Sequence, residues 1–206
     1  MNGFILTSFI STVALAIYGS FKFSNSNPIK WIVVYCLADA IIEIITNALA
    51  LNGIPNIFLY YILVWIETFL LLLYFKSVSA TIGSIPYLKL FIPVYVILLQ
   101  ILVFLSSTKS ISPYSGIFQG LLLFVLGLIS FHDELRAARY SDILREPFFW
   151  FVASCIVYYG CSSIVLIGAK IFAVDKEVFN YIWNYQNILS ILKNIMIATG
   201  FMLSRK

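Results

Sequence analysis

The segment that decides the fold is KWIVVYCLADAIIEIITNALAL, residues 30–51. It is apolar over a length sufficient to cross the hydrocarbon core of a bilayer, which takes about 20 residues of α-helix. Asp39 and Glu43 are the only charges in its interior. Polar stretches separate it from other apolar runs of similar length. We expect membrane-spanning helices at residues 2–19, 30–51, 56–75, 88–106, 113–131, 147–170 and 179–203.

The composition of the whole chain agrees with this interpretation. Of its 206 residues, 62% are hydrophobic and 11% are charged, and the mean hydropathy is +0.99. A soluble domain carries about 25% charged residues and lacks the interior volume to bury so large an apolar fraction. The sequence therefore predicts an all-α integral membrane protein, a seven-helix transmembrane bundle that forms one domain over residues 1–206.

Basic residues between the apolar runs indicate the orientation of the chain. With seven spans, nine of these residues fall on one side of the membrane: Lys22, Lys30, Lys76, Lys89, Arg136, Arg139, Arg145, Arg205 and Lys206. The other side holds Lys109, Lys170 and Lys176. Because lysine and arginine accumulate on the cytoplasmic side, we expect the N-terminus outside and the C-terminus in the cytoplasm. Topology thus explains the net charge of +4, and no nucleic-acid partner is expected.

Charged residues at membrane depth are the most informative feature of the chain. Asp39, Glu43, Glu67 and Lys193 lie near the middle of expected spans. Each costs about 2.5–3.5 kcal/mol at the centre of a lipid-facing helix, so together they would cost on the order of 10 kcal/mol. Asp39, Glu43 and Asn47 are four residues apart and share one helix face. We expect a buried polar cluster, in which Lys193 pairs with Glu43 or Glu67.

The candidate ligand-binding residues are the members of this cluster and their polar neighbours: Asp39, Glu43, Asn47, Glu67, Asn187, Lys193 and Asn194. Three acids against one lysine leave a surplus negative charge when all are ionised, which suits a cation, an amine or a transferable proton. The alternative is that the cluster only holds helices together, as interhelical polar contacts do modestly.

Other chemistry has little support in the sequence. Cys36, Cys155 and Cys161 lie in apolar segments without metal-ligand spacing and are interpreted as small buried hydrophobes. Ser190 and Lys193 form a lone S-x-x-K string, without the companion motifs of serine–lysine enzymes. No cofactor, metal site or catalytic residue is therefore predicted.

Several short strings carry a family resemblance. They are the N-G-I-P-N turn at 52–56, Ile66–Glu67, Phe149–Trp150 with Tyr158–Tyr159, and Lys193–Asn194 followed by A-T-G-F at 198–201. In these strings the chain resembles a group of small, uncharacterised seven-helix membrane proteins of Bacteroidota. The resemblance implies a bacterial cytoplasmic (inner) membrane and says little about activity.

Three functional hypotheses follow from these features. The first is a non-enzymatic binding protein, sensor-like or transporter-like, whose cluster holds a small molecule, cation or proton. The second is a membrane-embedded lipid-modifying enzyme with a carboxylate as general acid or base. The third is an oligomeric pore or accessory subunit that packs through the small residues Gly116, Gly120 and Gly127. The polar stretch at 132–146 is interpreted as a helical extension and solvated connector, with docking of a cytoplasmic or membrane protein partner as the alternative.

Overall fold

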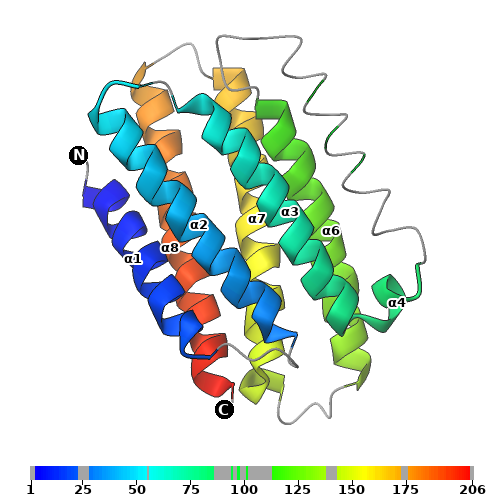
Figure 1. The fold of residues 1–206 in the computed structure, drawn as a ribbon. Coiled ribbons are helices and arrows are strands. Elements are labelled where there is room, and N and C mark those ends of the chain that lie inside the picture. The colour runs from blue at the N-terminus through cyan, green and yellow to red at the C-terminus, as the bar shows by residue number, and fades with distance from the viewer. Residues whose placement is uncertain are drawn as a thin grey trace.

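The structure, a computed structural model, describes residues 3–22, 28–54, 56–85, 94, 97, 101, 113–137, 143–172 and 176–204. Within these residues the chain is all-helical, as the sequence predicts (Figure 1). The elements are α1 (Gly3–Ser20), α2 (Ile29–Leu51), α3 (Ile57–Val78), α4 (Ala80–Gly83), α6 (Pro113–Ala137), the 3-10 turn η1 (Ile143–Arg145), α7 (Pro147–Phe172) and α8 (Lys176–Leu203).

The long helices begin and end within a few residues of the expected spans, with one exception. Helix α6 continues past residue 131 to Ala137, because its last turns contain no glycine or proline to end it. The short helix α4 was not expected. The span expected at 88–106 lies almost wholly outside the described residues.

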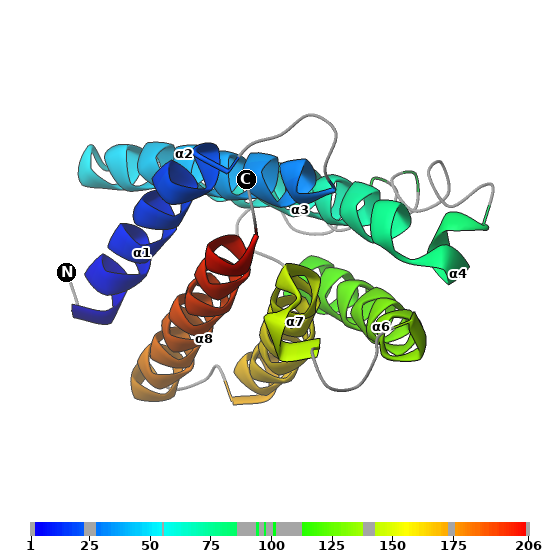
Figure 2. The same cartoon turned by 90° about the horizontal axis from the view of Figure 1, so that it is seen from below.

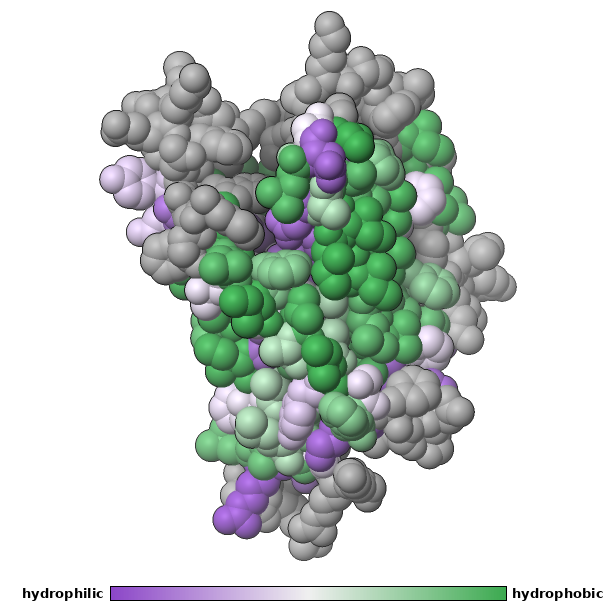
Figure 3. Space-filling model, turned by 60° about the vertical axis from the view of Figure 1, so that its left-hand side comes forward, coloured by the Kyte–Doolittle hydropathy of each residue, from purple (hydrophilic) through white to green (hydrophobic). Residues whose placement is uncertain are grey.

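Among the described residues, four helical segments are long and apolar enough to cross a membrane. They are Ile29–Leu51, Tyr61–Val78, Gly116–Arg136 and Pro147–Gly168, and a shorter apolar helix covers Ile5–Ser20. Large aliphatic side chains are exposed on their outer faces, such as Ile10 at 56% and Ile164 at 71%. Figure 3 shows this apolar surface as a broad green area between more polar ends. By length and composition, the chain is a helical membrane protein.

The long helices pack into a closed ring. Each contacts its two neighbours in the order α1, α2, α3, α6, α7, α8, and α8 returns to α1. Figure 2 shows the ring from below, with α2 and α3 along one side and α8, α7 and α6 along the other. The centre of the ring is therefore lined by all six helices.

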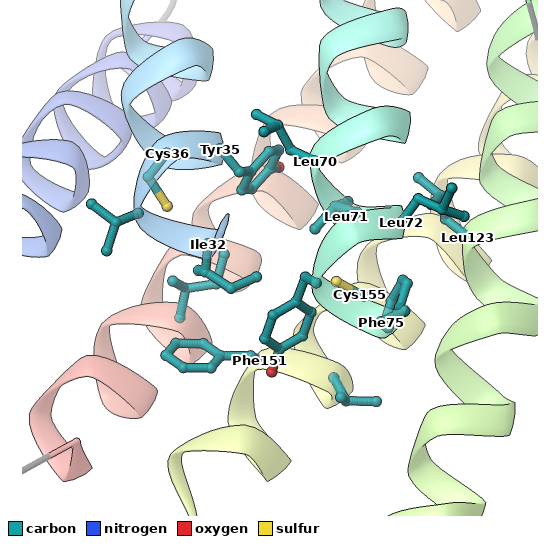
Figure 4. Packing of buried hydrophobic residues seen from close by; sticks show 14 of the residues in the cluster. Ile32, Tyr35, Cys36, Leu70, Leu71, Leu72, Phe75, Leu123, Phe151 and Cys155 are labelled. Carbon is teal, nitrogen blue, oxygen red and sulfur yellow. The ribbon is translucent and has the colours of Figure 1, made fainter. Parts of the chain in front are cut away.

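An apolar plug fills the half of the ring at which α1 ends and α2 begins. It consists of side chains that are at most 1% exposed: Ile32, Tyr74, Phe75, Phe151 and Phe201. Figure 4 shows Ile32, Phe75 and Phe151 converging between the helices. The Phe151 and Phe201 rings lie 5.2 Å apart between centroids, in an edge-on arrangement. Aromatic packing of this kind stabilises helix contacts in lipid, where burial of apolar area contributes little.

The small residues of α6 make contacts within the protein. Gly120 packs against Ser163 and the backbone of Tyr159, and Gly127 packs against Ile156. Both contacts are with α7, which explains how closely these two helices approach. Gly120 and Gly127 are therefore not available for the packing between subunits that the pore or accessory-subunit hypothesis requires. Gly116 lies in the wall of the central cavity described below.

The three cysteines differ in exposure according to the helix face on which they lie. Cys36 and Cys155 are buried, as expected, whereas Cys161 is exposed on the outer surface. Helix α7 presents Cys161 to the bilayer side because the neighbouring Ser162 and Ser163 occupy its inner face. The prediction of three buried cysteines is wrong for Cys161.

Asp133 anchors the corner between α3 and α4. Its carboxylate accepts hydrogen bonds from the hydroxyl groups of Ser79 and Thr81 and from the backbone N–H of Thr81. Ser79 in turn caps α4 by accepting from the N–H of Ile82. The polar stretch that begins at residue 132 is thus helical at its start, as expected, and also ties α6 to the end of α3.

Replacing Asp133 with alanine should lower the free energy of unfolding, because its carboxylate accepts from a backbone N–H of the first turn of α4 as a helix cap does. Three donors at the α3–α4 corner then lose their acceptor. The measurement is thermal unfolding of the purified protein in detergent. His132→Gln is the matched control. The His132 ring is exposed and lies 3.8 Å from the carboxylate, but none of the three hydrogen bonds at the α3–α4 corner comes from it. Equal stability of both variants would contradict an anchoring role for Asp133.

Candidate functional site: a polar cavity inside the helix ring

An ion pair between α8 and α2 forms the centre of the polar cluster. Lys193 Nζ lies 3.1 Å from Asp39 Oδ2, and the two side chains are 4% and 13% exposed. The expected partners of Lys193 were Glu43 or Glu67, so this prediction is wrong. Residue counting gives the depth of a side chain only to about one helical turn, or 5.4 Å. Asp39 and Glu43 are four residues apart, a difference in depth of about 6 Å.

Tyr35 connects the ion pair to the second buried acid. The Lys193 ammonium donates to the Tyr35 hydroxyl at 2.6 Å. That hydroxyl donates in turn to Glu67 Oε1 at 3.1 Å. Tyr35 is 2% exposed, so this connection lies away from lipid. Lys193 thereby interacts with two carboxylates, directly with Asp39 and through the Tyr35 hydroxyl with Glu67.

Glu67 accepts hydrogen bonds from three helices. Besides Tyr35 on α2, the Tyr159 hydroxyl of α7 donates to Oε1 at 3.3 Å. The Gln119 amide of α6 donates to Oε2 at 3.1 Å. Glu67 is 7% exposed, and a buried carboxylate is tolerated only when its oxygens are matched by donors. These contacts join α2, α3, α6 and α7 across the centre of the ring.

Aromatic rings surround the Lys193 ammonium. Its Nζ lies 5.1 Å from the centroid of Tyr35 and 4.7 Å from that of Tyr158. Both distances are within the range of cation–π attraction, which strengthens when the cation is desolvated. The ammonium thus has a carboxylate, a hydroxyl and two ring faces as partners.

A second layer of polar contacts lies beside the ion pair, between α7 and α8. Gln186 Nε2 donates to the Tyr158 hydroxyl at 3.2 Å and to Ser162 Oγ at 3.0 Å. Its carbonyl oxygen Oε1 is buried and has no hydrogen-bond partner among the described residues. A buried amide oxygen without a partner is energetically unfavourable, which makes Gln186 a candidate contact for a ligand.

A cavity of about 450 Å³ lies directly beside this cluster. Lys193, Asp39 and Glu67 form its inner end, and it extends toward Asn56 at the turn between α2 and α3. Small and aliphatic side chains from α1, α2, α3, α6 and α7 complete the wall. The cavity therefore occupies the half of the ring opposite the apolar plug, so the centre of the molecule is polar and hollow at one end and closed at the other.

Most of the residues predicted from the sequence line this cavity. Asp39, Glu43, Asn47, Glu67, Asn187 and Lys193 all belong to its wall.

Asn194 is the exception. Its amide donates to Ser11 Oγ at 2.8 Å and to Thr12 Oγ1 at 3.1 Å, both on α1. Consecutive residues of an α-helix point about 100° apart, so Lys193 and Asn194 face different neighbours. Asn194 joins α8 to α1 and is not among the residues that line the cavity.

Sequence reasoning missed the side chains that link the charges: Tyr35, Tyr158, Tyr159, Gln119 and Gln186. A signal existed for two of them. Tyr35 precedes Asp39 by four residues and extends the stripe of Asp39, Glu43 and Asn47. Gln186 precedes Ser190 by the same spacing. Gln119 and the two α7 tyrosines carry no such pattern, because only the packing of α6 and α7 brings them to Glu67.

The described residues contain no group of three or more histidine, cysteine, aspartate or glutamate side chains placed to bind a metal ion. Asp39 and Glu67, two of the acids of the cavity, are instead joined through Lys193 and Tyr35. No family model, curated protein or solved structure matches this chain.

Proposed function

We propose that this protein is a non-enzymatic, multi-pass membrane protein that binds a small ligand in the central cavity, as a sensor or a transporter does. The cavity itself carries the proposal. Its volume of about 450 Å³ lies within the usual range for small-molecule sites, about 300–1,000 Å³. Buried charges that only joined helices would be packed tightly, whereas here Lys193 and Glu67 border open space.

The proposal includes seven spans, an outside N-terminus and a bacterial inner membrane, in keeping with the resemblance to membrane proteins of Bacteroidota. The distribution of charge supports the orientation. Five described basic residues lie near the plugged end of the ring: Lys22, Lys30, Lys76, Arg136 and Arg145. The other basic residues that were used to predict the orientation lie outside the described residues or have side chains that are not described. In this orientation the cavity faces the outside.

The closed inner half of the ring suits either version of the proposal. A transporter with this structure would be in a state that gives its ligand access from the outside only, and the plug would have to part for release. A sensor would keep the plug and respond through a change in helix packing. In that case a cytoplasmic or membrane protein partner would receive the signal.

An enzyme is less well supported. Ser190 and Lys193 both line the cavity, but the Lys193 ammonium donates to Asp39 and Tyr35. A lysine held as a charged donor is not a base for activating a serine hydroxyl. A pore is also less well supported, because the aromatic side chains of the plug fill the centre of the ring.

Filling the cavity tests the proposal. Leu63→Trp should abolish stabilisation by any ligand that binds there, because the larger ring would occupy the wall from α3. The measurement is the thermal midpoint of the purified protein against a panel of amines, metal cations, sugars and lipids. A ligand at about 100 times its dissociation constant should add about 2.7 kcal/mol to the stability of the natural sequence.

Ile62→Trp is the matched control for this substitution. Ile62 is the preceding residue of α3, but its side chain is 44% exposed on the outer surface. It should keep the response to the ligand. If no member of the panel stabilises the natural protein, or if both tryptophan variants respond alike, the central cavity is not a binding site.

A further inference from the structure

We propose that the ligand of the central cavity is a small organic cation with a primary ammonium group, bound at Glu43. This inference rests on the proposed function of the cavity as a binding site. It follows from three properties of the cavity wall: its charge balance, the direction of its hydrogen-bonding groups and the occupation of its aromatic faces.

The charge balance calls for a cation. Asp39, Glu43 and Glu67 line the cavity, and Lys193 is the single cation among the described residues of the wall. Lys193 is already committed to Asp39, and through Tyr35 to Glu67. Glu43 lies one turn further along α2, toward the Asn56 end of the cavity. Inside a membrane protein, a carboxylate surplus attracts a cation more strongly than it would in water.

Two amide groups of the wall, those of Asn47 and Asn56, use their nitrogens for contacts within the protein. Asn47 donates its amide to the backbone oxygen of Glu43 at 2.9 Å, and Asn56 donates to that of Thr46 at 3.1 Å. A backbone oxygen can only accept, so these contacts determine which end of each amide is the nitrogen. The carbonyl oxygens of Asn47 and Asn56 are then the groups left for a ligand.

Gln119 extends this pattern, and Gln186 adds a buried oxygen. Gln119 donates to Val64 O and to Glu67, so its nitrogen is likewise committed to acceptors. The Gln186 oxygen is buried without a partner among the described residues. Together with the Glu43 carboxylate, the wall offers oxygen acceptors. Its complement is a ligand rich in N–H donors.

The aromatic groups distinguish one kind of organic cation from another. A quaternary ammonium has no N–H donor and is bound by the faces of aromatic rings. The faces of Tyr35 and Tyr158 are turned toward the Lys193 ammonium instead. A primary ammonium carries three N–H donors and matches a carboxylate with surrounding carbonyl oxygens. Aliphatic wall residues such as Ile5 and Ile42 suit a short hydrocarbon portion of the same ligand.

Three probes with the same butyl chain test this inference on the purified protein with its natural sequence. They are n-butylammonium, butyltrimethylammonium and 1-butanol, compared by isothermal titration and by thermal midpoint at constant ionic strength. We expect n-butylammonium to bind at least about tenfold more tightly than the other two, a difference of about 1.4 kcal/mol. Because this comparison needs no substitution, it does not depend on the folding of any variant.

Glu43→Gln tests the position of the ammonium. It should weaken n-butylammonium binding by at least about tenfold while the thermal midpoint without ligand changes little, since Glu43 is only half-buried. Glu146→Gln is the matched control, because Glu146 is an exposed acid at the opposite end of the ring, between η1 and α7. It should leave binding unchanged.

The results separate this inference from the proposed function. Failure of n-butylammonium to bind, equal binding of butyltrimethylammonium or 1-butanol, or unchanged binding to Glu43→Gln would each overturn the ammonium site. If a sugar, metal ion or lipid of the wider panel still stabilised the protein, and Leu63→Trp abolished that effect, the cavity would remain a binding site for another class of ligand. Without any such effect, the proposed function would fail as well.

Discussion

Replacing Lys193 with methionine should lower the free energy of unfolding by about 3–5 kcal/mol, the largest effect expected of any single substitution in the cluster. Methionine has similar length and removes the charge. Asp39 would then be a buried carboxylate without its cation, and Tyr35 would lose the ammonium that donates to it. The measurement is unfolding of the purified protein in mixed detergent micelles, with membrane insertion checked separately.

A second substitution identifies the partner of the lysine. Asp39→Asn in the Lys193→Met background should restore part of the lost stability, because it removes the uncompensated charge. Glu67→Gln in the same background should restore less, since Glu67 keeps Tyr159 and Gln119 as donors. A double-mutant cycle isolates the coupling between each pair. Stronger rescue by Glu67→Gln than by Asp39→Asn would show that the direct ion pair is not the dominant interaction.

Replacing Gly200 with alanine should be the second most damaging change. A Cβ atom at this position of α8 would lie 2.5, 2.8 and 2.9 Å from three ring atoms of Phe151. Real Cβ contacts essentially never fall below 3.0 Å. The ring has little room to retreat, because it is fully buried between Tyr74 and Phe201. We expect a loss of about 1–3 kcal/mol, typical of overpacking, in thermal unfolding.

Gly168 provides the matched control on the neighbouring helix. A Cβ atom there would meet nothing within 4 Å, so Gly168→Ala should be neutral or should stabilise α7 by up to about 1 kcal/mol through helix propensity. If Gly200→Ala were as stable as Gly168→Ala, the plug would be less tightly packed than the structure shows. In a transporter, Gly200→Ala should also alter release to the inside, because it acts on the closed half of the ring.

The positions of the helices could be predicted from the sequence because the hydrocarbon core of a bilayer restricts which backbone structures can cross it. Backbone polar groups without water must be satisfied within the span, so apolar runs of about 20 residues become helices. The predicted runs at 30–51 and 147–170 accordingly correspond to α2 and α7 within a few residues. The start of the short helix α4 is held by Asp133, a residue from a distant part of the chain. No local sequence pattern predicts this helix.

The interior position of the charged residues was also accessible from the sequence. Asp39, Glu43 and Asn47 share a helix face, and the cost of exposing two carboxylates to lipid places that face toward the protein. The same reasoning applied to Tyr35 would have added the residue that links Lys193 to Glu67. Asn194 shows the opposite case: it follows Lys193 in the sequence, but its side chain contacts Ser11 and Thr12 of α1.

By itself, the sequence determined that this chain is helical, belongs in a membrane and carries its charges inside, because the hydrophobic thickness of the bilayer and the cost of desolvation act on every segment separately. Only the tertiary structure decided that Lys193 meets Asp39, that Asn194 turns to α1, and that the ring is hollow at one end and plugged at the other. These features depend on the rotation and axial shift of one helix against another. Side-chain packing determines the rotation and the axial shift, and the pattern of apolar runs in the sequence contains no information on either.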